Sequence, residues 1–395
     1  LDSGCAKHKT TDQFFEYIPQ RNFFYLTGLA VENQRLMILK QGKTVKEFLF
    51  IEETTEYMRQ WVGEKMSKEE ASEISGVPVS NVLYLDKFDS YFKSMMTYSR
   101  GLGVKPPKRL YLDMYRYKQN QNPDSLNVFG KLIDNYKELK VKNLNEHISF
   151  LRMFKSSDEI DDLKKAIAIT DIGLKRIMDA LKIRDNERQI EADFLHEIRL
   201  QGSEGNSFNT IAANGVNATV LHYEANNDTL GKDNLLLCDL GALYNNYGSD
   251  ISRTYPVSGV FTDRQKELYE IVLKANKESI EFVKPGITWI ELNEFAKSIL
   301  IDGAKKAGLI KEDNEIMKYY YHSIGHFLGL DVHDVGQYDQ VLQEGMVITI
   351  EPGLYIKEEG IGIRIEDDIL ITKDGRINLS KEIIKEVKDI EKHMI

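Results

Sequence analysis

The residues that most constrain how this chain can fold are acids placed inside apolar runs that are typical of β-strands. Asp239 interrupts the run LLLCDLG, which predicts a strand covered on both faces. An unpaired carboxylate would be costly to desolvate there, so Asp239 needs a partner. Asp250 follows eleven residues later, after the turn-like NNYGS. That separation lets two adjacent antiparallel strands bring both acids to one place.

Two later runs place acids on one face of a strand. Successive side chains of a strand point to opposite faces. In IGIRIEDD, Arg364 and Glu366 therefore share a face, opposite the isoleucines. In VITIEPG, Glu351 shares a face with Thr349, and Pro352 marks the end or the edge of the strand. These strands present acids where apolar residues would be more favourable.

Four carboxylates on these strands imply a cation between them. Without one, the acids would repel one another and some would hold protons, whereas a pair of divalent metal ions removes that repulsion. Arg364 is the one basic residue in these strands near an acid of the set, and it cannot neutralise four carboxylates. A mostly oxygen ligand set with a single imidazole suits manganese, or cobalt or iron, better than a closed tetrahedral zinc site.

Three of the eight histidines lie in one segment, HSIGHFLGLDVHDVG. His322 and His326 stand four residues apart, like the zinc-binding pair of an HExxH helix. That motif's glutamate is missing, however, and Gly325 and Gly329 disfavour a helix, so we predict a glycine-bent loop and strand. A lone histidine is usually a hydrogen-bonded packing residue. Three within twelve residues, with His333 as the third, indicate a functional cluster.

The chain is long enough, at 395 residues, for two domains with separate cores. Residues 1–150 mix short apolar runs with helical stretches and predict a small α/β domain. The pattern changes around residues 145–157, where Ser156 and Glu159 form a capping box that begins a long amphipathic helix. Residues 151–395 predict an α+β domain, with helices packed on a largely antiparallel sheet.

Charge and hydropathy exclude several partners. The net charge of −10 repels phosphate backbones, so no nucleic acid is expected, and the basic stretch 105–118 is predicted to be a strand with a solvated face. No apolar window approaches the length needed to cross a bilayer, so no membrane association is expected. The two isolated cysteines, Cys5 and Cys238, argue against a disulfide framework and favour a cytoplasmic protein.

Four segments in order, DLGALYNNYGSDISRTYP, HSIGHFLGLDVHDVG, TIEPGLY and GIRIEDD, resemble the metal-binding motifs of the aminopeptidase P and prolidase family. The amino-terminal PQRNFFYLTGL resembles a stretch of that family's amino-terminal domain. The resemblance implies a pita-bread catalytic domain over residues 151–395, preceded by a smaller creatinase-like α/β domain over residues 1–150. It also implies two divalent metal ions, with manganese favoured and cobalt, zinc and iron as alternatives.

The same resemblance assigns the ligands. Asp239 resembles the acid that chelates one metal, and Asp250 and Glu366 resemble the two bridging acids. His326 and Glu351 resemble the ligands of the other metal.

Further positions resemble family residues around the substrate. His222, in VLHYEAN, resembles the histidine near the scissile bond, and His333 resembles the one that contacts the substrate carbonyl or the product. His322 resembles a histidine that lines the proline pocket. Arg364 and Tyr355 resemble residues that hold the metal ligands in place, and we assign both to the substrate-binding set.

The resemblance implies an Xaa-Pro aminopeptidase, which releases the first residue from peptides with proline in second position by means of a hydroxide that bridges two metals. Glu351 would shuttle a proton, and His222 and His333 would stabilise the intermediate and protonate the departing proline nitrogen. A homodimer or homotetramer is expected by the same resemblance.

Two alternatives remain open. An Xaa-Pro dipeptidase (prolidase) would share all five ligands, although a compact amino-terminal domain without long insertions favours the aminopeptidase. A non-catalytic peptide-binding member of the family would be expected to have lost ligands, and none is lost. Other hydrolase classes find no support, because the chain has no GxSxG elbow and no complete phosphate-binding loop.

Overall fold

The computed structural model describes residues 1–97, 105–116 and 118–394. The chain divides into two compact units, Leu1–Ser149 and Phe150–Ile395, and each is described by itself. None of the helices in the described part of the chain combines the length and the apolar character that a bilayer crossing requires. The two cysteines, one exposed and one buried, are free thiols.

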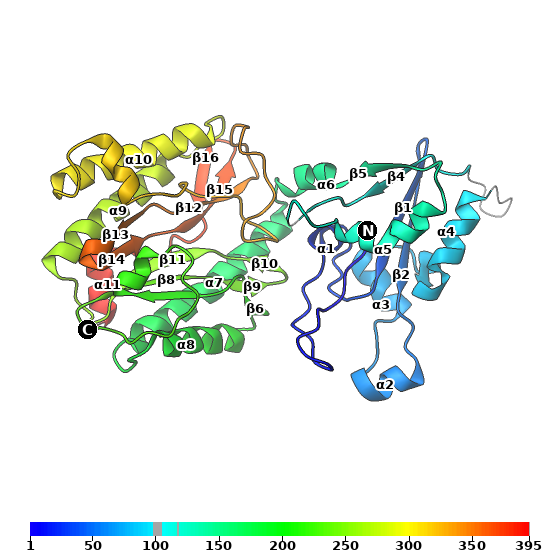
Figure 1. Ribbon diagram of the computed structural model, residues 1–395, viewed down its shortest axis with the longest axis horizontal. Coiled ribbons are helices and arrows are strands. Elements are labelled where there is room, and N and C mark those ends of the chain that lie inside the picture. Colours follow the sequence, from blue (N-terminus) through cyan, green and yellow to red (C-terminus); the bar gives the residue numbers. More distant parts are fainter. Residues whose placement is uncertain (98–104, 117, 395) are drawn as a thin grey trace. The chain divides into compact units, whose positions relative to one another are not determined.

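The smaller unit is a mixed α/β domain, as predicted (Figure 1). Its strands are β1 (Arg35–Gln41), β2 (Thr44–Ile51), β3 (Val82–Tyr84), β4 (Arg109–Leu112) and β5 (Lys140–Asn143). Its helices are α1 (Arg21–Thr27), α2 (Glu56–Val62), α3 (Lys68–Ser75), α4 (Phe88–Met96) and α5 (Asp124–Asp134), and α6 (Asn145–Arg152) crosses the division between the units. Strands β1, β2 and β3 form one sheet, and β4 pairs with β5 in parallel.

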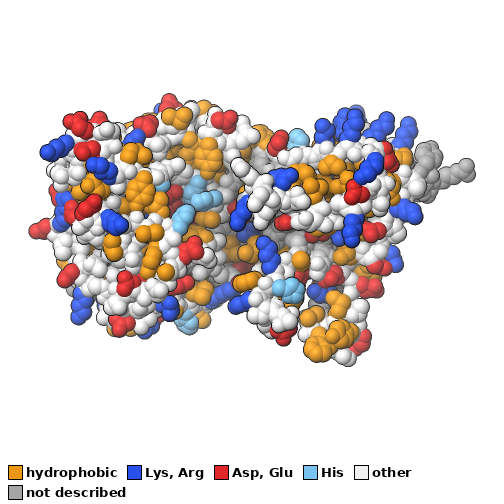
Figure 2. Space-filling model, in the orientation of Figure 1, with side chains coloured by type: hydrophobic (Ala, Val, Ile, Leu, Met, Phe, Trp, Pro, Cys, Tyr) orange, Lys and Arg blue, Asp and Glu red, His pale blue; other side chains and the backbone are white. Residues whose placement is uncertain are grey.

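The basic stretch 105–118 contains β4, which has the solvated face that was predicted. Arg109 and Tyr111 are exposed, and the parallel register places them beside the exposed Lys140 and Lys142 of β5. Lys and Arg side chains gather over this part of the unit in Figure 2. Residue 117 of the stretch lies outside the described residues.

The helices of the larger unit begin at capping residues in the sequence. Helix α7 (Ser157–Ala180) starts at the predicted capping box of Ser156 and Glu159, and its apolar face is buried. The other helices are α8 (Glu187–Leu200), α9 (Asp263–Phe282), α10 (Trp289–Lys306) and α11 (Val387–Met394), with short 3-10 turns at η3 (Gly215–Thr219), η4 (Asp313–Lys318) and η5 (Lys357–Glu359). Helices α9 and α10 also begin at capping boxes.

The strands of the larger unit are short and pair antiparallel, which confirms the predicted α+β class. They are β6 (Gly205–Asn206), β7 (Ile211–Asn214), β8 (Leu235–Leu240), β9 (Ala242–Tyr244), β10 (Tyr247–Gly248), β11 (Ile251–Pro256), β12 (Val347–Ile350), β13 (Gly353–Ile356), β14 (Ile361–Arg364), β15 (Asp367–Thr372) and β16 (Gly375–Asn378). Figure 1 shows α7 and α8 on one side of these strands and α9 and α10 on the other.

The four acids lie in or next to the ends of strands. In the antiparallel pair of β8 and β11, Asp239 lies opposite Ser252, so Asp250, two residues before Ser252, lies diagonally across from Asp239. Glu351 directly follows β12, and Glu366 lies between β14 and β15. Acids from separate hairpins therefore reach one face of the strands.

Candidate metal centre

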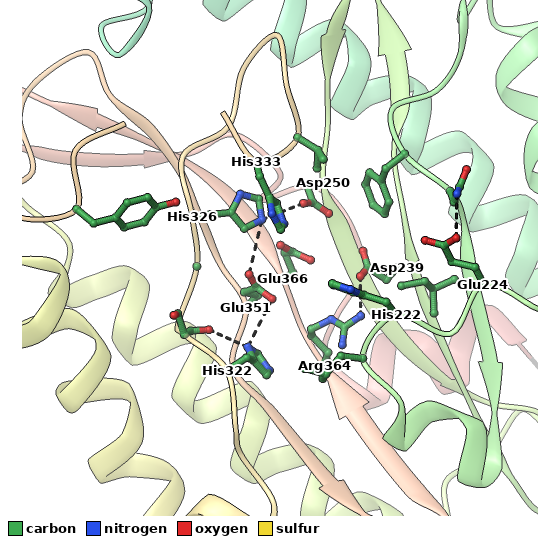
Figure 3. Close-up of a pocket in the computed structure, with 18 residues that line it drawn as sticks. His222, Glu224, Asp239, Asp250, His322, His326, His333, Glu351, Arg364 and Glu366 are labelled. Carbon is green, nitrogen blue, oxygen red and sulfur yellow. Dashed lines mark hydrogen bonds and ion pairs between the residues drawn. The ribbon is translucent and has the colours of Figure 1, made fainter. Parts of the chain in front are cut away.

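The five predicted metal ligands line one cavity of about 510 Å³ in the larger unit. Their side chains enter it from β8, from the start of β11, from the glycine-rich loop before β12 and from the segments that follow β12 and β14. Figure 3 shows these side chains converging, with labelled histidines around them. The ligands are Asp239, Asp250, His326, Glu351 and Glu366.

Three of these residues form the tightest group. Asp250, His326 and Glu366 each offer a ligand atom, and these atoms lie within 4.8 Å of one another. The His326 Nε2 lies 3.3 Å from Asp250 Oδ2 and 3.7 Å from Glu351 Oε1. Asp239 completes the cavity wall but does not belong to this tightest group.

The orientation of the His326 ring suits a metal ligand. Its Nδ1 lies 2.9 Å from the carbonyl oxygen of Phe327, which can only accept a hydrogen bond. The proton is therefore assigned to Nδ1, and the lone pair of Nε2 points toward Asp250 and Glu351. A hydrogen bond to the second ring nitrogen commonly fixes a metal-binding histidine in this way.

Arg364 holds Asp239 from one side only. Its Nη2 donates to Asp239 Oδ2 (2.5 Å), its Nε to Ser252 Oγ (2.8 Å) and its Nη1 to the Tyr355 hydroxyl (3.0 Å). Ser252 in turn donates to Glu366 Oε2 at 2.8 Å. The other oxygen of Asp239 is buried and has no hydrogen-bond partner among the described residues. An unpartnered carboxylate oxygen that faces other acids fits a cation ligand.

Electrostatics also favour bound cations. Burial raises the pKa of Asp250 and of Glu366 well above the usual range for carboxyl groups, and the neighbouring carboxylates raise both further. Burial raises the pKa of Glu351 to about 7, although His326 and Arg364 oppose the shift. Protein groups alone therefore do not compensate these acids, and the donor set of four carboxylates and one imidazole fits divalent metal ions.

The remaining predicted residues lie around this group, with one exception. His222, His322, His333 and Arg364 line the cavity. Tyr355, which the sequence predicts in the substrate-binding set, is absent from the residues that line the cavity, and its role toward substrate stays a prediction. Its side chain is buried behind the cavity wall, where its hydroxyl contacts His322 Nε2 (2.8 Å) and Arg364 Nη1. Tyr355 can therefore orient these two side chains.

Two of the histidines are held neutral. Burial, followed by the positive charge of Arg364, lowers the pKa of His322 to about 4. Burial, followed by His326, lowers the pKa of His333 to about 4. The rings of His326 and His333 lie 4.1 Å apart between centroids. Neutral imidazoles can both donate and accept hydrogen bonds beside a substrate.

Several residues of the site were not predicted from the sequence. Ser252 links Arg364 to Glu366. It lies two residues after Asp250, so the alternation of side chains along a strand could have placed both on one face. Asp368 is fully buried and accepts a hydrogen bond from the Asp250 backbone N–H at 3.3 Å. Like Asp239, it is an acid within an apolar strand, and this position could have indicated that it belongs to the site. Glu224 lines the cavity two residues after His222.

Gly325 makes the close approach that seats His326. A Cβ atom at this position would stand 2.0 Å from the carbonyl oxygen of Thr349 in β12. We expect Gly325→Ala to displace the loop, to lower the free energy of unfolding by about 1–3 kcal/mol and to reduce the metal content of the protein. Denaturant unfolding and metal analysis measure both effects. Gly375→Ala is the control, because nothing lies within 4 Å of a Cβ there; equal effects of the two substitutions would contradict the prediction.

Two family models and several known proteins match this chain. The model of metallopeptidase family M24 matches residues 161–373, and that of the aminopeptidase P N-terminal domain matches residues 1–102. An Xaa-Pro aminopeptidase from Haemophilus influenzae is 32% identical over 100% of this chain and 92% of its own length. A solved structure from Bacillus anthracis, provisionally described as an aminopeptidase P, is 45% identical with a TM-score of 0.93, over 100% of this chain and 92% of that one.

A dipeptidase also matches, but over less of the chain. An Xaa-Pro dipeptidase from Pyrococcus furiosus is 38% identical over 67% of this chain and 76% of its own length. The Haemophilus influenzae protein and the Bacillus anthracis structure, which each match along the whole chain, carry aminopeptidase names.

Proposed function

Because this chain belongs to metallopeptidase family M24 and carries an aminopeptidase P amino-terminal domain, we propose that it is a metal-dependent Xaa-Pro aminopeptidase. Residues 151–395 would form the catalytic domain and residues 1–150 the amino-terminal domain. The observation that carries the proposal is the convergence of four carboxylates and His326 in one cavity that His222, His322 and His333 also line.

Family membership implies divalent metal ions, and we propose that Asp239, Asp250, His326, Glu351 and Glu366 hold two of them, with manganese favoured. When bound, the ions would activate a water molecule as the nucleophile and polarise the scissile carbonyl. Cobalt, zinc and iron remain alternatives, because the same ligand types also bind those metals.

The side chains around the ligands would position the substrate and move protons. The two oxygens of Glu351 lie 3.7 Å from His326 Nε2 and 3.8 Å from His322 Nδ1, so Glu351 lies between the ligand group and a histidine of the cavity. There it would take the proton of the activated water and pass it on. His222 and His333 would stabilise the tetrahedral intermediate and protonate the departing proline nitrogen. His322 would line the proline pocket.

The charges of the cavity favour a peptide that continues beyond proline. Arg364 is the one lysine or arginine among the described residues that line it, and its guanidinium is already engaged by Asp239, Ser252 and Tyr355. An Xaa-Pro dipeptide would bring a free carboxylate to the proline, where it would meet no uncommitted cation. Glu224 in the same cavity would repel it.

A direct assay separates the two peptidases. With manganese present, we expect kcat/KM for an Xaa-Pro-Yaa tripeptide to exceed that for the Xaa-Pro dipeptide by at least about tenfold, which corresponds to roughly 1.4 kcal/mol of unfavourable charge contact. A chelator should abolish both activities. Rapid cleavage of the dipeptide with little tripeptide turnover would identify a dipeptidase, and activity that survives chelation would refute the metal mechanism. Binding without any cleavage would identify the non-catalytic alternative.

We further propose a homodimer or homotetramer in the cytoplasm, on the basis of the family resemblance. Light scattering on the purified protein measures the assembly, since a mass near that of the single chain of 45.5 kDa would contradict it.

A further inference from the structure

Glu187 is a buried carboxylate that lies outside the cavity. It is the first residue of α8, and its side chain is fully buried. Its Oε1 accepts hydrogen bonds from the Asn214 backbone N–H (2.7 Å) and Asn217 Nδ2 (3.1 Å). Its Oε2 accepts from the Tyr223 hydroxyl (2.8 Å) and the Asp228 backbone N–H (2.9 Å). Four neutral donors thus satisfy both oxygens, and the amino-terminal end of α8 favours the negative charge.

All four donors belong to one segment, residues 214–228, and this segment carries His222 and Glu224 into the cavity. Asn214 ends β7, and after the short turn η3 residues 220–228 have no helix or strand. Regular backbone hydrogen bonding therefore cannot determine where His222 lies. Ordering such a segment costs conformational entropy, which side-chain contacts have to offset.

The contacts of Glu187 lie on both sides of His222 in the sequence. Asn214 and Asn217 precede it, whereas Tyr223 follows it directly. Asn226 adds a second anchor. Its side chain accepts a hydrogen bond from the Ala212 backbone N–H at 3.0 Å and donates one to the carbonyl oxygen of Thr210, directly before β7, at 2.7 Å. The backbone around His222 is therefore fixed by buried side chains that do not themselves enter the cavity.

The proton on Tyr223 makes its bond to Glu187 directional. Burial, followed by the hydrogen bond and the negative charge of Glu187, raises the pKa of Tyr223 to about 12, so the phenol remains a donor at neutral pH. Glutamine at position 187 would keep the size of the side chain. It would turn an amide N–H₂ toward two of the donors, however, and at least one anchor would be lost.

We propose that Glu187 is a positioning residue for peptide hydrolysis, and that it sets the place of His222 in the cavity through Tyr223 and the backbone of residues 214–228. The proposal rests on the proposed function, in which His222 acts on the substrate. It assigns Glu187 no contact with substrate or metal.

A double-mutant cycle on the metal-loaded enzyme tests this role. Glu187→Gln and Tyr223→Phe are each combined with His222→Ala, and kcat and KM are measured on an Xaa-Pro-Yaa tripeptide. We expect each single variant to lower kcat by about 10- to 100-fold, the scale on which a misplaced group costs rate, with metal content unchanged. If Glu187 acts through His222, adding either substitution to His222→Ala should lower kcat by less than about twofold more.

Tyr247→Phe is the matched control. The Tyr247 hydroxyl donates to Glu159 Oε1 at 2.9 Å, so the substitution removes the same kind of bond from a tyrosine that does not line the cavity. We expect it to leave kcat within about twofold of the wild type. Circular dichroism identifies any variant that fails to fold, and Tyr223→Phe keeps the test available if Glu187→Gln does not fold.

Three results would overturn the proposal: an unchanged kcat for Tyr223→Phe, losses that multiply in the double variants, or full activity of His222→Ala. A wild-type enzyme that does not cleave Xaa-Pro-Yaa at all is a different result, because it refutes the proposed function itself.

Discussion

Asp250→Asn is expected to abolish peptide hydrolysis, with kcat/KM on an Xaa-Pro-Yaa tripeptide falling by more than about 10³-fold. This loss should exceed the 10- to 100-fold typical of residues that only support metal ligands. Asparagine keeps the size of the side chain but removes the charge from the group that Asp250 forms with His326 and Glu366. Metal content, measured on the same preparations, should fall with the activity.

The metal-free protein provides a second readout of the same substitution. Without metal, Asp250 is buried among other carboxylates, so asparagine should leave the melting temperature of the metal-free protein unchanged or raised. Added manganese should stabilise the wild type by mass action but not the variant. Asp193→Asn is the control, because Asp193 is a buried acid of the same unit that pairs with Arg176 and Arg184 and does not line the cavity. Metal content unchanged in Asp250→Asn would contradict the ligand assignment.

Arg253→Met is expected to cause the largest loss of stability, about 3–5 kcal/mol in the free energy of unfolding. Arg253 is fully buried, and its Nη2 donates to the equally buried Asp367 at 2.9 Å. Its Nη1 donates to the backbone carbonyl of Glu366 at 2.5 Å, and Lys385 Nζ contacts the other oxygen of Asp367. Removal of the guanidinium would leave part of this buried charge uncompensated next to Glu366, a proposed metal ligand.

Urea unfolding of the chelated protein measures this loss without the contribution of metal binding. Arg264→Met is the matched control. Arg264 pairs with Glu359 and Glu267 at the surface, and exposed pairs contribute at most about 1 kcal/mol. If both variants lost the same free energy of unfolding, the burial of Arg253 would not explain its contribution to stability.

The convergence of the five proposed ligands in one cavity could be predicted from the sequence because its signals are local. Acids inside apolar strands and histidines beside glycines each stand out within a window of about ten residues. Capping boxes are local in the same sense, and α7 begins where Ser156 and Glu159 predicted. Strand parity also predicted that Arg364 and Glu366 share a face, and both line the cavity.

The contacts between side chains of the site could not be predicted from local sequence patterns, because they join positions far apart in the chain. The contact of the buried Tyr355 hydroxyl with His322 depends on how β13 packs. Arg364 and Asp239 are 125 positions apart, and no local pattern pairs them.

The sequence by itself determined which acids gather in the cavity, since an acid in an apolar strand is unfavourable wherever that strand packs and therefore indicates a compensating partner. Only the tertiary structure decided which groups hold those residues in place. Glu187 carries no local signal, because a glutamate at the start of a helix is ordinary. Its burial against residues 214–228 depends on the packing of α8, and that packing makes it an anchor for His222.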